Sequence, residues 1–267
     1  MFSKRSSQSR RNKPNRFLSC ENLEERRLLA ADVTNGVLTI QSEPQARAVP
    51  QTVVSQSNHH ITVRQNQSVM PFPRNQVRKI VFHGTEKKDV FDNRTNVSAT
   101  VFGKGGNDIL YAGAAHDVIF GGSGNDRIIF HRGGGVAYGQ AGADLISAQN
   151  TDNRIRAYGG KGRDRIFGGN LADRLYGGSG NDTVSGGKGN DIVSGGGGND
   201  HLWDGDGRDI VLGGGGVDQF YMDYGNRDDG DLDRISFGGW AQLKNEAHFA
   251  TDYWFSINGK LNEGDYR

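Results

Sequence analysis

The sequence predicts an all-β, repetitive fold over residues 102–221, in which short nine-residue units stack on one another. An aspartate recurs at nine-residue intervals in this segment, and a large apolar residue follows each aspartate two places later. Composition changes at the same boundary: 33 of the 41 glycines lie between Gly103 and Tyr221, whereas all five prolines lie at or before Pro73. A fixed period with its own composition is typical of a repeat protein.

The aspartate ladder defines thirteen units. Two of its slots hold Gly135 and Asn153 instead, and the pair Ala157 and Tyr158 lengthens one step to eleven residues. The aspartates are Asp108, Asp117, Asp126, Asp144, Asp164, Asp173, Asp182, Asp191, Asp200, Asp209 and Asp218.

The apolar slot of each unit predicts a three-residue strand with one inward side chain, because its neighbours are mixed in character. The slot residues are Leu110, Ile119, Ile128, Ala137, Ile146, Ile155, Ile166, Leu175, Val184, Val193, Leu202, Val211 and Phe220. One buried side chain cannot hold a unit alone. Units stacked about 4.8 Å apart merge these side chains into one core.

The glycines and aspartates predict metal-binding turns. Glycine permits positive φ and leaves backbone carbonyls uncovered, and the carboxylate supplies charge. Such flexible, all-oxygen sites suit Ca²⁺ better than Mg²⁺, and thiol or imidazole metals lack ligands here. The glycines assigned to the turns are Gly122, Gly124, Gly178, Gly180, Gly187, Gly189, Gly196 and Gly198.

The unit G-G-x-G-x-D-x-U-x, seen at 177–185, resembles the calcium-binding repeat of RTX proteins over about 120 residues. The resemblance implies a parallel β-roll with two units per coil. Turns eighteen residues apart then lie side by side, which places Asp182 near Asp164 and Asp200, and Asp191 near Asp173 and Asp209.

The two edges of this roll are unequal in sequence. The first edge, from Asp108 to Asp218, keeps a carboxylate in each turn, although the two-residue insertion is expected to strain the step from Asp144 to Asp164. The second edge, from Asp117 to Asp209, has Gly135 and Asn153 in place of two carboxylates in its first half. We therefore expect roughly eight calcium ions, with fewer on the second edge. Because the core is thin and the carboxylates repel, the repeats are expected to fold only on binding calcium.

Other readings of the glycine-rich segment fail. A linker would not keep an apolar residue two places after each aspartate, and the glycine period is not the three of collagen. Asp229, Asp231 and Asp233 have the spacing of an EF-hand, but Arg234 and Trp240 stand where glycine and glutamate are needed. The sequence also lacks a P-loop.

Residues 32–101 predict a small β-rich N-terminal cap, with strands at 37–40, 61–64 and 77–82. The segment from His83 is read as a degenerate first unit, with Asp89 and Phe91 in the repeat slots. His59 and His60 could bind a metal, but no third ligand has suitable spacing.

Residues 222–267 predict an α+β C-terminal cap, with a closing strand at 229–237, a short helix within 240–254 and a turn at Asn258. Aromatic residues gather there and are interpreted as a plug over the last coil, with a carbohydrate or partner platform as the alternative. They are Phe237, Trp240, Phe249, Tyr253, Trp254 and Phe255.

Residues 1–31 form a basic leader. The segment 23–29 resembles the LEPRxLL leader of large bacterial extracellular proteins, with Glu25 in the proline position, which favours targeting over nucleic-acid binding. Cys20 is the one cysteine, so no intrachain disulfide can form, and no run of about 20 apolar residues could span a membrane. Weak calcium sites would fill outside the cell, so an extracellular location is expected.

Two classes of function remain. The first is a secreted or cell-surface structural or adhesive protein whose partners are calcium ions and a surface or matrix polysaccharide or protein. The second is the accessory domain of an RTX hydrolase or polysaccharide-modifying enzyme. Neither H-E-x-x-H nor G-x-S-x-G occurs, so the chain is not expected to be an enzyme.

Overall fold

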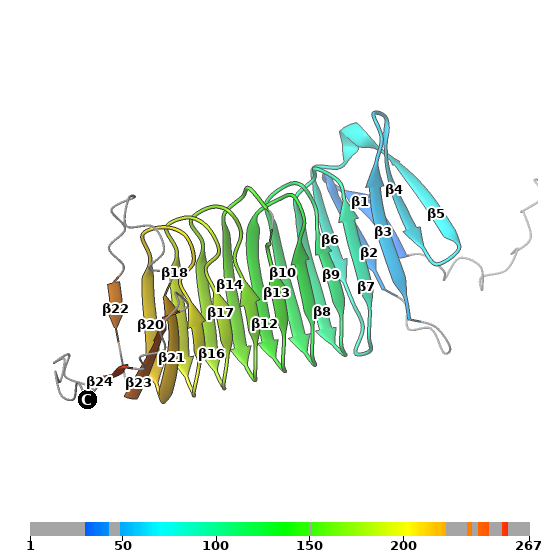
Figure 1. The fold of residues 1–267 in the computed structure, drawn as a ribbon. Coiled ribbons are helices and arrows are strands. Elements are labelled where there is room, and N and C mark those ends of the chain that lie inside the picture. Colours follow the sequence, from blue (N-terminus) through cyan, green and yellow to red (C-terminus); the bar gives the residue numbers. More distant parts are fainter. Residues whose placement is uncertain are drawn as a thin grey trace, which may run out of the picture.

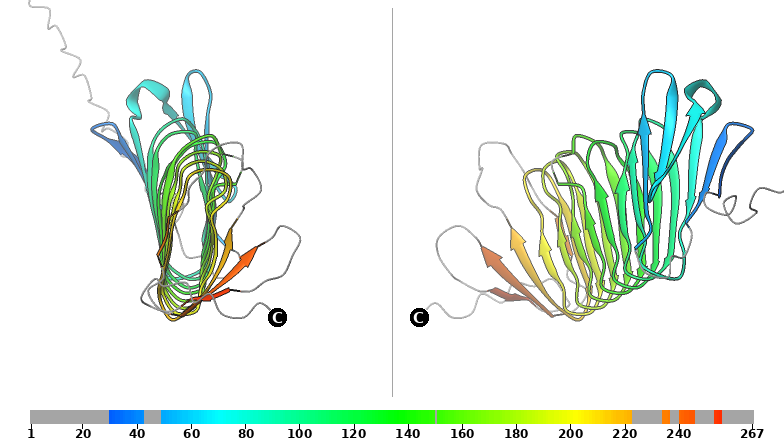
Figure 2. Two further views of the ribbon diagram at one scale, coloured as in Figure 1. Left: turned by 60° about the vertical axis from the view of Figure 1, so that its left-hand side comes forward. Right: turned by 90° about the vertical axis from the view of Figure 1, so that its right-hand side faces the viewer.

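The chain folds into a β-solenoid in which two sheets face each other along the length of the molecule (Figure 1). The structure is a computed structural model. It describes residues 30–42, 49–149 and 151–222, together with short strands at 234–236, 240–245 and 253–255. Seen nearly along the axis, the coils are flattened ovals (Figure 2). The parallel roll expected from the repeats is confirmed.

The eleven-stranded sheet consists of β1 (Ala30–Thr34), β2 (Val37–Gln41), β6 (Lys79–His83), β8 (Ala99–Gly105), β10 (Asp117–Ser123), β12 (Gly135–Ala141), β14 (Ile155–Lys161), β16 (Arg174–Ser179), β18 (Ile192–Gly197), β20 (Ile210–Gly215) and β22 (Arg234–Ser236). The thirteen-stranded sheet consists of β3 (Gln51–Gln56), β4 (His60–Gln65), β5 (Ser68–Pro73), β7 (Val90–Arg94), β9 (Ile109–Ala112), β11 (Arg127–Phe130), β13 (Leu145–Ser147), β15 (Arg165–Phe167), β17 (Thr183–Ser185), β19 (His201–Trp203), β21 (Val217–Met222), β23 (Trp240–Asn245) and β24 (Tyr253–Phe255). A 3₁₀ turn, η2 (Arg74–Gln76), follows β5.

Each coil contributes one strand to each sheet and pairs in parallel with the coils before and after it. Ile119 pairs with Val101 on one side and Ala137 on the other, so residues eighteen apart share a row. The inward side chains of both sheets meet in one continuous core, and most of its members are fully buried. This arrangement explains the period of the sequence, because each nine-residue unit crosses the core once.

The strands of the two sheets differ in length, which the uniform unit did not predict. Within the repeats, strands of the thirteen-stranded sheet are mostly three or four residues long, as at β17, whereas those of the eleven-stranded sheet have six or seven, as at β10. The extra residues are the first glycines of the following turn, which continue the ladder at Gly122 opposite Gln140. Turn and strand therefore overlap on one side of the roll.

The two-residue insertion lies earlier than the sequence alignment placed it. Ile155 pairs with Gly135, and Ala157 pairs with Ala137, so Ala157 occupies the core row and the additional residues fall in the loop before β14. The assignments of Ile155 to the apolar slot and of Asn153 to the aspartate slot are therefore wrong. A longer loop leaves both ladders in register, which is energetically easier than bulging a central strand.

Antiparallel strands close the N-terminal end of the roll. β1 pairs with β2, and the meander β3, β4, β5 forms the outer edge of the other sheet. The three strands expected in this region correspond to β2, β4 and β6. The outermost strand, β5, carries Pro71 and Pro73, which cannot donate to a further strand and so protect the edge from pairing with other chains.

At the C-terminal end, the helix expected within 240–254 is wrong in the parts that the structure describes, because residues 240–245 and 253–255 are strands β23 and β24. β23 pairs in parallel with β21, and β24 pairs antiparallel with β23. The unpaired edge of β21 offers a row of backbone partners, which outweighs local helical periodicity. The EF-hand-like aspartates and Asn258 lie outside the described residues.

Candidate calcium sites

The turns of the roll have the backbone conformation that the glycines predicted. All eight glycines assigned to the turns have positive φ, between +99° and +134°. At Gly124 and Gly198, a Cβ atom would overlap the carbonyl oxygen of the glycine one coil earlier. Only glycine allows this close stacking of neighbouring turns.

The first edge consists of the turns that follow the eleven-stranded sheet, and its aspartates point inward and are almost completely buried. One carboxylate oxygen, Oδ1, accepts the backbone N–H of the aspartate one coil earlier. The backbone N–H of Asp164 donates to Oδ1 of Asp182, and the backbone N–H of Asp182 donates to Oδ1 of Asp200, both at 2.8 Å. The expected proximity of these three residues is confirmed, and the carboxylates bind adjacent coils together.

The second carboxylate oxygen, Oδ2, is buried and has no hydrogen-bond partner in most of these turns. This holds for Asp108, Asp126, Asp144, Asp164, Asp182 and Asp200 on the first edge, and for Asp191 on the second. A buried acceptor without a donor is costly, and a positively charged partner would offset the cost of a row of them.

The unpartnered oxygens face backbone carbonyls across the space that the first glycine leaves open. At Gly177, a Cβ atom would lie 2.5 Å from Asp182 Oδ2 and 2.6 Å from the carbonyl oxygen of Gly195 on the next coil. Both oxygens therefore approach one small cradle. Carboxylate and carbonyl oxygens from a flexible turn are the ligands that Ca²⁺ prefers, so these residues fit that ion.

Burial changes the acid–base behaviour of the carboxylates when no cation is bound. Desolvation, with a smaller contribution from neighbouring aspartates, raises the pKa of Asp144, Asp164 and Asp200 to about 7. The N–H donated to each carboxylate opposes part of this rise. Loss of water is thus the main cost of these sites, and a cation would offset it.

Side chains alone do not complete a metal site in this roll. Within the described residues, no three His, Cys, Asp or Glu side chains converge. His59 lies exposed in the loop before β4, and His60 is the exposed first residue of that strand. Any ion must take most of its ligands from backbone carbonyls, which favours Ca²⁺ over Zn²⁺.

The second edge is formed by the turns that follow the thirteen-stranded sheet. Its carboxylates differ in whether Oδ2 accepts a hydrogen bond. Asp173 donates its N–H to Asp191, and Asp191 to Asp209, which confirms that these three are neighbours. Asp117 and Asp173, however, each accept a turn amide at Oδ2, from Gly113 at 2.6 Å and from Gly169 at 2.7 Å. These two carboxylates are satisfied without an ion, so the structure favours fewer sites here.

A ladder of asparagines was missed by the sequence reasoning. Asn107 Oδ1 accepts the N–H of Asn125, and Asn181 Oδ1 accepts the N–H of Asn199, eighteen residues on. The signal was present, because asparagine precedes aspartate in many units. These exposed amides hold successive turns at the spacing that the inner sites need.

A second ladder, of stacked aromatic rings, follows the outer face of the eleven-stranded sheet. Phe120 stacks on Tyr138 at 4.9 Å, and Tyr138 on Tyr158 at 5.0 Å between ring centroids. The stack consists of His83, Phe102, Phe120, Tyr138, Tyr158 and Tyr176. Such rings stabilise a flat sheet through side-chain contacts between neighbouring strands.

The fold and its sites define a calcium-binding parallel β-roll. The family model of the RTX calcium-binding nonapeptide repeat matches in four copies, at residues 98–128, 138–173, 158–193 and 185–220. Residues 98–220 therefore carry RTX calcium-binding nonapeptide repeats. No curated protein matches the sequence significantly. In the described part of the chain, no helix has the length and apolar character needed to cross a membrane.

Proposed function

We propose that the chain is a secreted or cell-surface structural protein whose roll folds when calcium fills the first edge. The observation that carries this proposal is the row of buried Oδ2 atoms from Asp108 to Asp200, which from Asp108 to Asp182 face a carbonyl on the next coil. A ligand that binds only the folded form stabilises it by mass action. Calcium ions would then link neighbouring coils.

An extracellular location follows from the same chemistry. Sites assembled from one carboxylate and several carbonyls per turn are weaker than the charged loops of cytosolic calcium buffers. Such sites fill at the calcium concentrations found outside cells. The absence of a disulfide framework is compatible with this location, because ions replace the covalent links between coils.

A structural or adhesive role is favoured over catalysis by the open groove on the thirteen-stranded sheet. Its acidic and imidazole groups, Asp92 and His131, have other partners: Asp92 pairs with Arg94, and His131 stacks on Tyr111. None of the residues that line it is serine or cysteine, and the hydroxyl of Thr95 donates to the amide oxygen of Asn93 rather than to a base. A nucleophile held by a base is thus lacking at this position.

The test is circular dichroism of the full chain in calcium-free buffer and then in millimolar calcium, with magnesium as a control. The proposal predicts a large gain of β signal with calcium and little with magnesium. Unchanged β content on adding calcium would refute calcium-dependent folding. Location is tested separately, by surface proteolysis of intact cells that produce the protein.

A further inference from the structure

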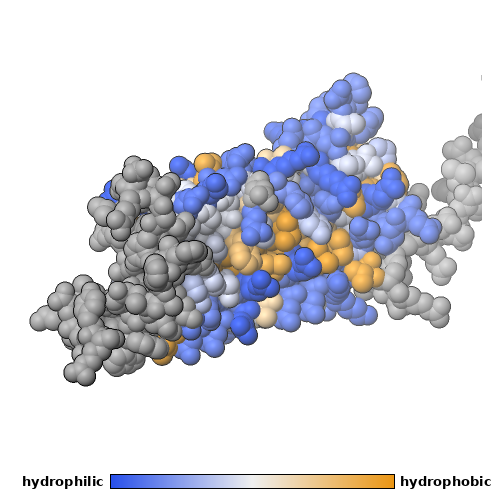
Figure 3. Space-filling model, viewed as in Figure 1, coloured by the Kyte–Doolittle hydropathy of each residue, from blue (hydrophilic) through white to orange (hydrophobic). Residues whose placement is uncertain are grey.

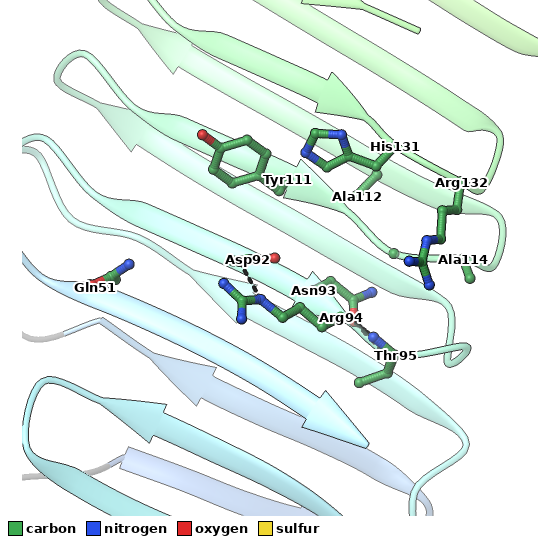
Figure 4. Close-up of a pocket in the computed structure, with 11 residues that line it drawn as sticks. Gln51, Asp92, Asn93, Arg94, Thr95, Tyr111, Ala112, Ala114, His131 and Arg132 are labelled. Atoms are coloured by element: carbon green, nitrogen blue, oxygen red, sulfur yellow. Dashed lines mark hydrogen bonds and ion pairs between the residues drawn. The ribbon is translucent and has the colours of Figure 1, made fainter. Parts of the chain in front are cut away.

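A groove of about 890 Å³ lies on the thirteen-stranded sheet (Figure 4), and none of the first-edge aspartates lines it. β7, β9 and the turn after β11 supply most of its walls. The lining side chains are Gln51, Asp92, Arg94, Tyr111, His131 and Arg132, above a floor formed by Asn93, Thr95 and residues 112–114.

The groove carries more positive than negative groups. Arg94 Nε donates to Asp92 Oδ2 at 2.7 Å, which fixes the guanidinium and leaves its terminal nitrogens for a ligand. Arg132 reaches the groove from the opposite side (Figure 4). Its turn is held by Asn153, whose amide donates to the Arg132 carbonyl at 2.6 Å. The Arg94 guanidinium lies beside Asp92 and that of Arg132 lies at the other end of the groove, so together they favour a ligand with oxyanions at separate points.

An aromatic pair lies between these charges. The rings of Tyr111 and His131 stack with centroids 5.3 Å apart and an interplanar angle of 12°. Tyr111 adds a hydroxyl, and Gln51 adds an exposed amide at the rim. Rings that present C–H-binding surface beside hydroxyl and amide groups match the mixed apolar and polar character of a sugar ring.

The floor of the groove is rigid without any ion. Asn93 accepts from Thr95 and donates to Asp117, while Asp117 also accepts the N–H of Gly113. This part of the second edge is where the repeat loses its carboxylates. Side-chain hydrogen bonds close the turns here, so the groove is preorganised by the protein itself.

From this combination we propose that the groove binds an acidic oligosaccharide, with Arg94 and Arg132 contacting the carboxylates of different uronate units. The inference rests on the proposed surface role and gives it a partner chemistry. Asp92 repels phosphate and carboxylate alike, but its remaining oxygen can accept hydroxyl groups, which an oligosaccharide carries on every ring and a DNA strand lacks along its length. A neutral sugar would leave the two guanidiniums without a matching charge.

The experiment uses the calcium-loaded full chain and calorimetric titration with short oligogalacturonates, too short to gel with calcium. The double substitution R94Q/R132Q is expected to weaken binding at least tenfold. The matched control is R156Q/R174Q, which removes two exposed arginines from β14 and β16 in the opposite sheet and should leave binding unchanged.

Three outcomes would overturn the proposal: no binding of the oligouronate, equal binding of a neutral oligoglucan, or tighter binding of a single-stranded DNA oligomer. Circular dichroism of the same samples separates these results from failure of the calcium proposal. A chain that folds with calcium yet ignores oligouronates retains its structural role and loses only this ligand. Equal effects of the two double substitutions would likewise exclude the groove.

Discussion

The backbone N–H of Asp144 donates to Oδ1 of Asp164 at 2.8 Å. Twenty residues separate these two aspartates, whereas equivalent aspartates on other neighbouring coils are eighteen residues apart. The strain expected at this step is therefore absent. The two additional residues are accommodated on the second edge, in the loop before β14. The first edge keeps an uninterrupted series of carboxylates, which makes it the stronger candidate for calcium binding.

Replacing Asp182 with asparagine should lower both calcium stoichiometry and cooperativity, because it removes a charge that faces the Gly195 carbonyl. The matched change is Asp117→Asn, which breaks hydrogen bonds to Gly113 and Asn93 instead. We expect D117N to cost about 1–3 kcal/mol of stability with little change in bound calcium. Atomic absorption of dialysed protein, with thermal melts, distinguishes the two. Equal calcium loss in both would contradict this assignment.

The calcium-free roll should be more stable in acid than at neutral pH. Burial raises the pKa of Asp144, Asp164 and Asp200 to about 7, above the ordinary 3.8, so the folded state binds protons more tightly than the unfolded state. This contribution is complete below about pH 4 and is lost as pH rises through about 7. Circular dichroism in calcium-depleted buffer should show more β content at pH 5 than at pH 8, and the reverse order would contradict it.

Adjacent glycines should respond very differently to alanine. At Gly198, φ is +134° and a Cβ atom would overlap the Gly180 carbonyl, whereas at Gly197 nothing lies within 4 Å. Gly198→Ala should destabilise the calcium-bound roll by roughly 2 kcal/mol or more, from left-handed backbone strain and the clash. Gly197→Ala should be nearly neutral. Calcium-dependent melting of both variants measures the contrast.

The asparagine ladder should contribute to spacing between turns. Asn181→Ala removes the acceptor for the Asn199 N–H and should cost about 0.5–1.5 kcal/mol, because the bond is exposed. Ala143→Asn places an amide at a rung that lacks one and should stabilise by a similar or smaller amount. Chemical denaturation in saturating calcium tests both, and a destabilising Ala143→Asn would exclude a general role for the ladder.

Side chains on the outer faces of the sheets should contribute modestly to stability. Figure 3 shows a band of apolar residues along the middle of one face, surrounded by hydrophilic ones. Within the ladder, Tyr158→Ala removes ring contacts to Tyr138 and Tyr176 and should cost about 1 kcal/mol. Thermal melting in calcium, with Tyr111→Ala outside the ladder for comparison, checks this contribution.

The sequence by itself determined the repeat, its core row and the identity of its turns. Gly178 and Gly180 have the positive φ that their positions predicted, and Asp182 lies between Asp164 and Asp200. These features are local or strictly periodic, so spacing alone carries them. The N-terminal strands β2, β4 and β6 could be predicted for the same reason, from short runs of alternating apolar residues.

Only the tertiary structure decided where the insertion lies, which carboxylates remain unsatisfied and how the ends close. Asp173 and Asp182 occupy the same place in the repeat, yet one accepts the Gly169 amide and the other leaves Oδ2 without a donor. The strands of 240–245 and 253–255 pair along the open edge of β21. Each of these outcomes depends on partners on neighbouring coils, and a periodic pattern does not encode which partner supplies a hydrogen bond.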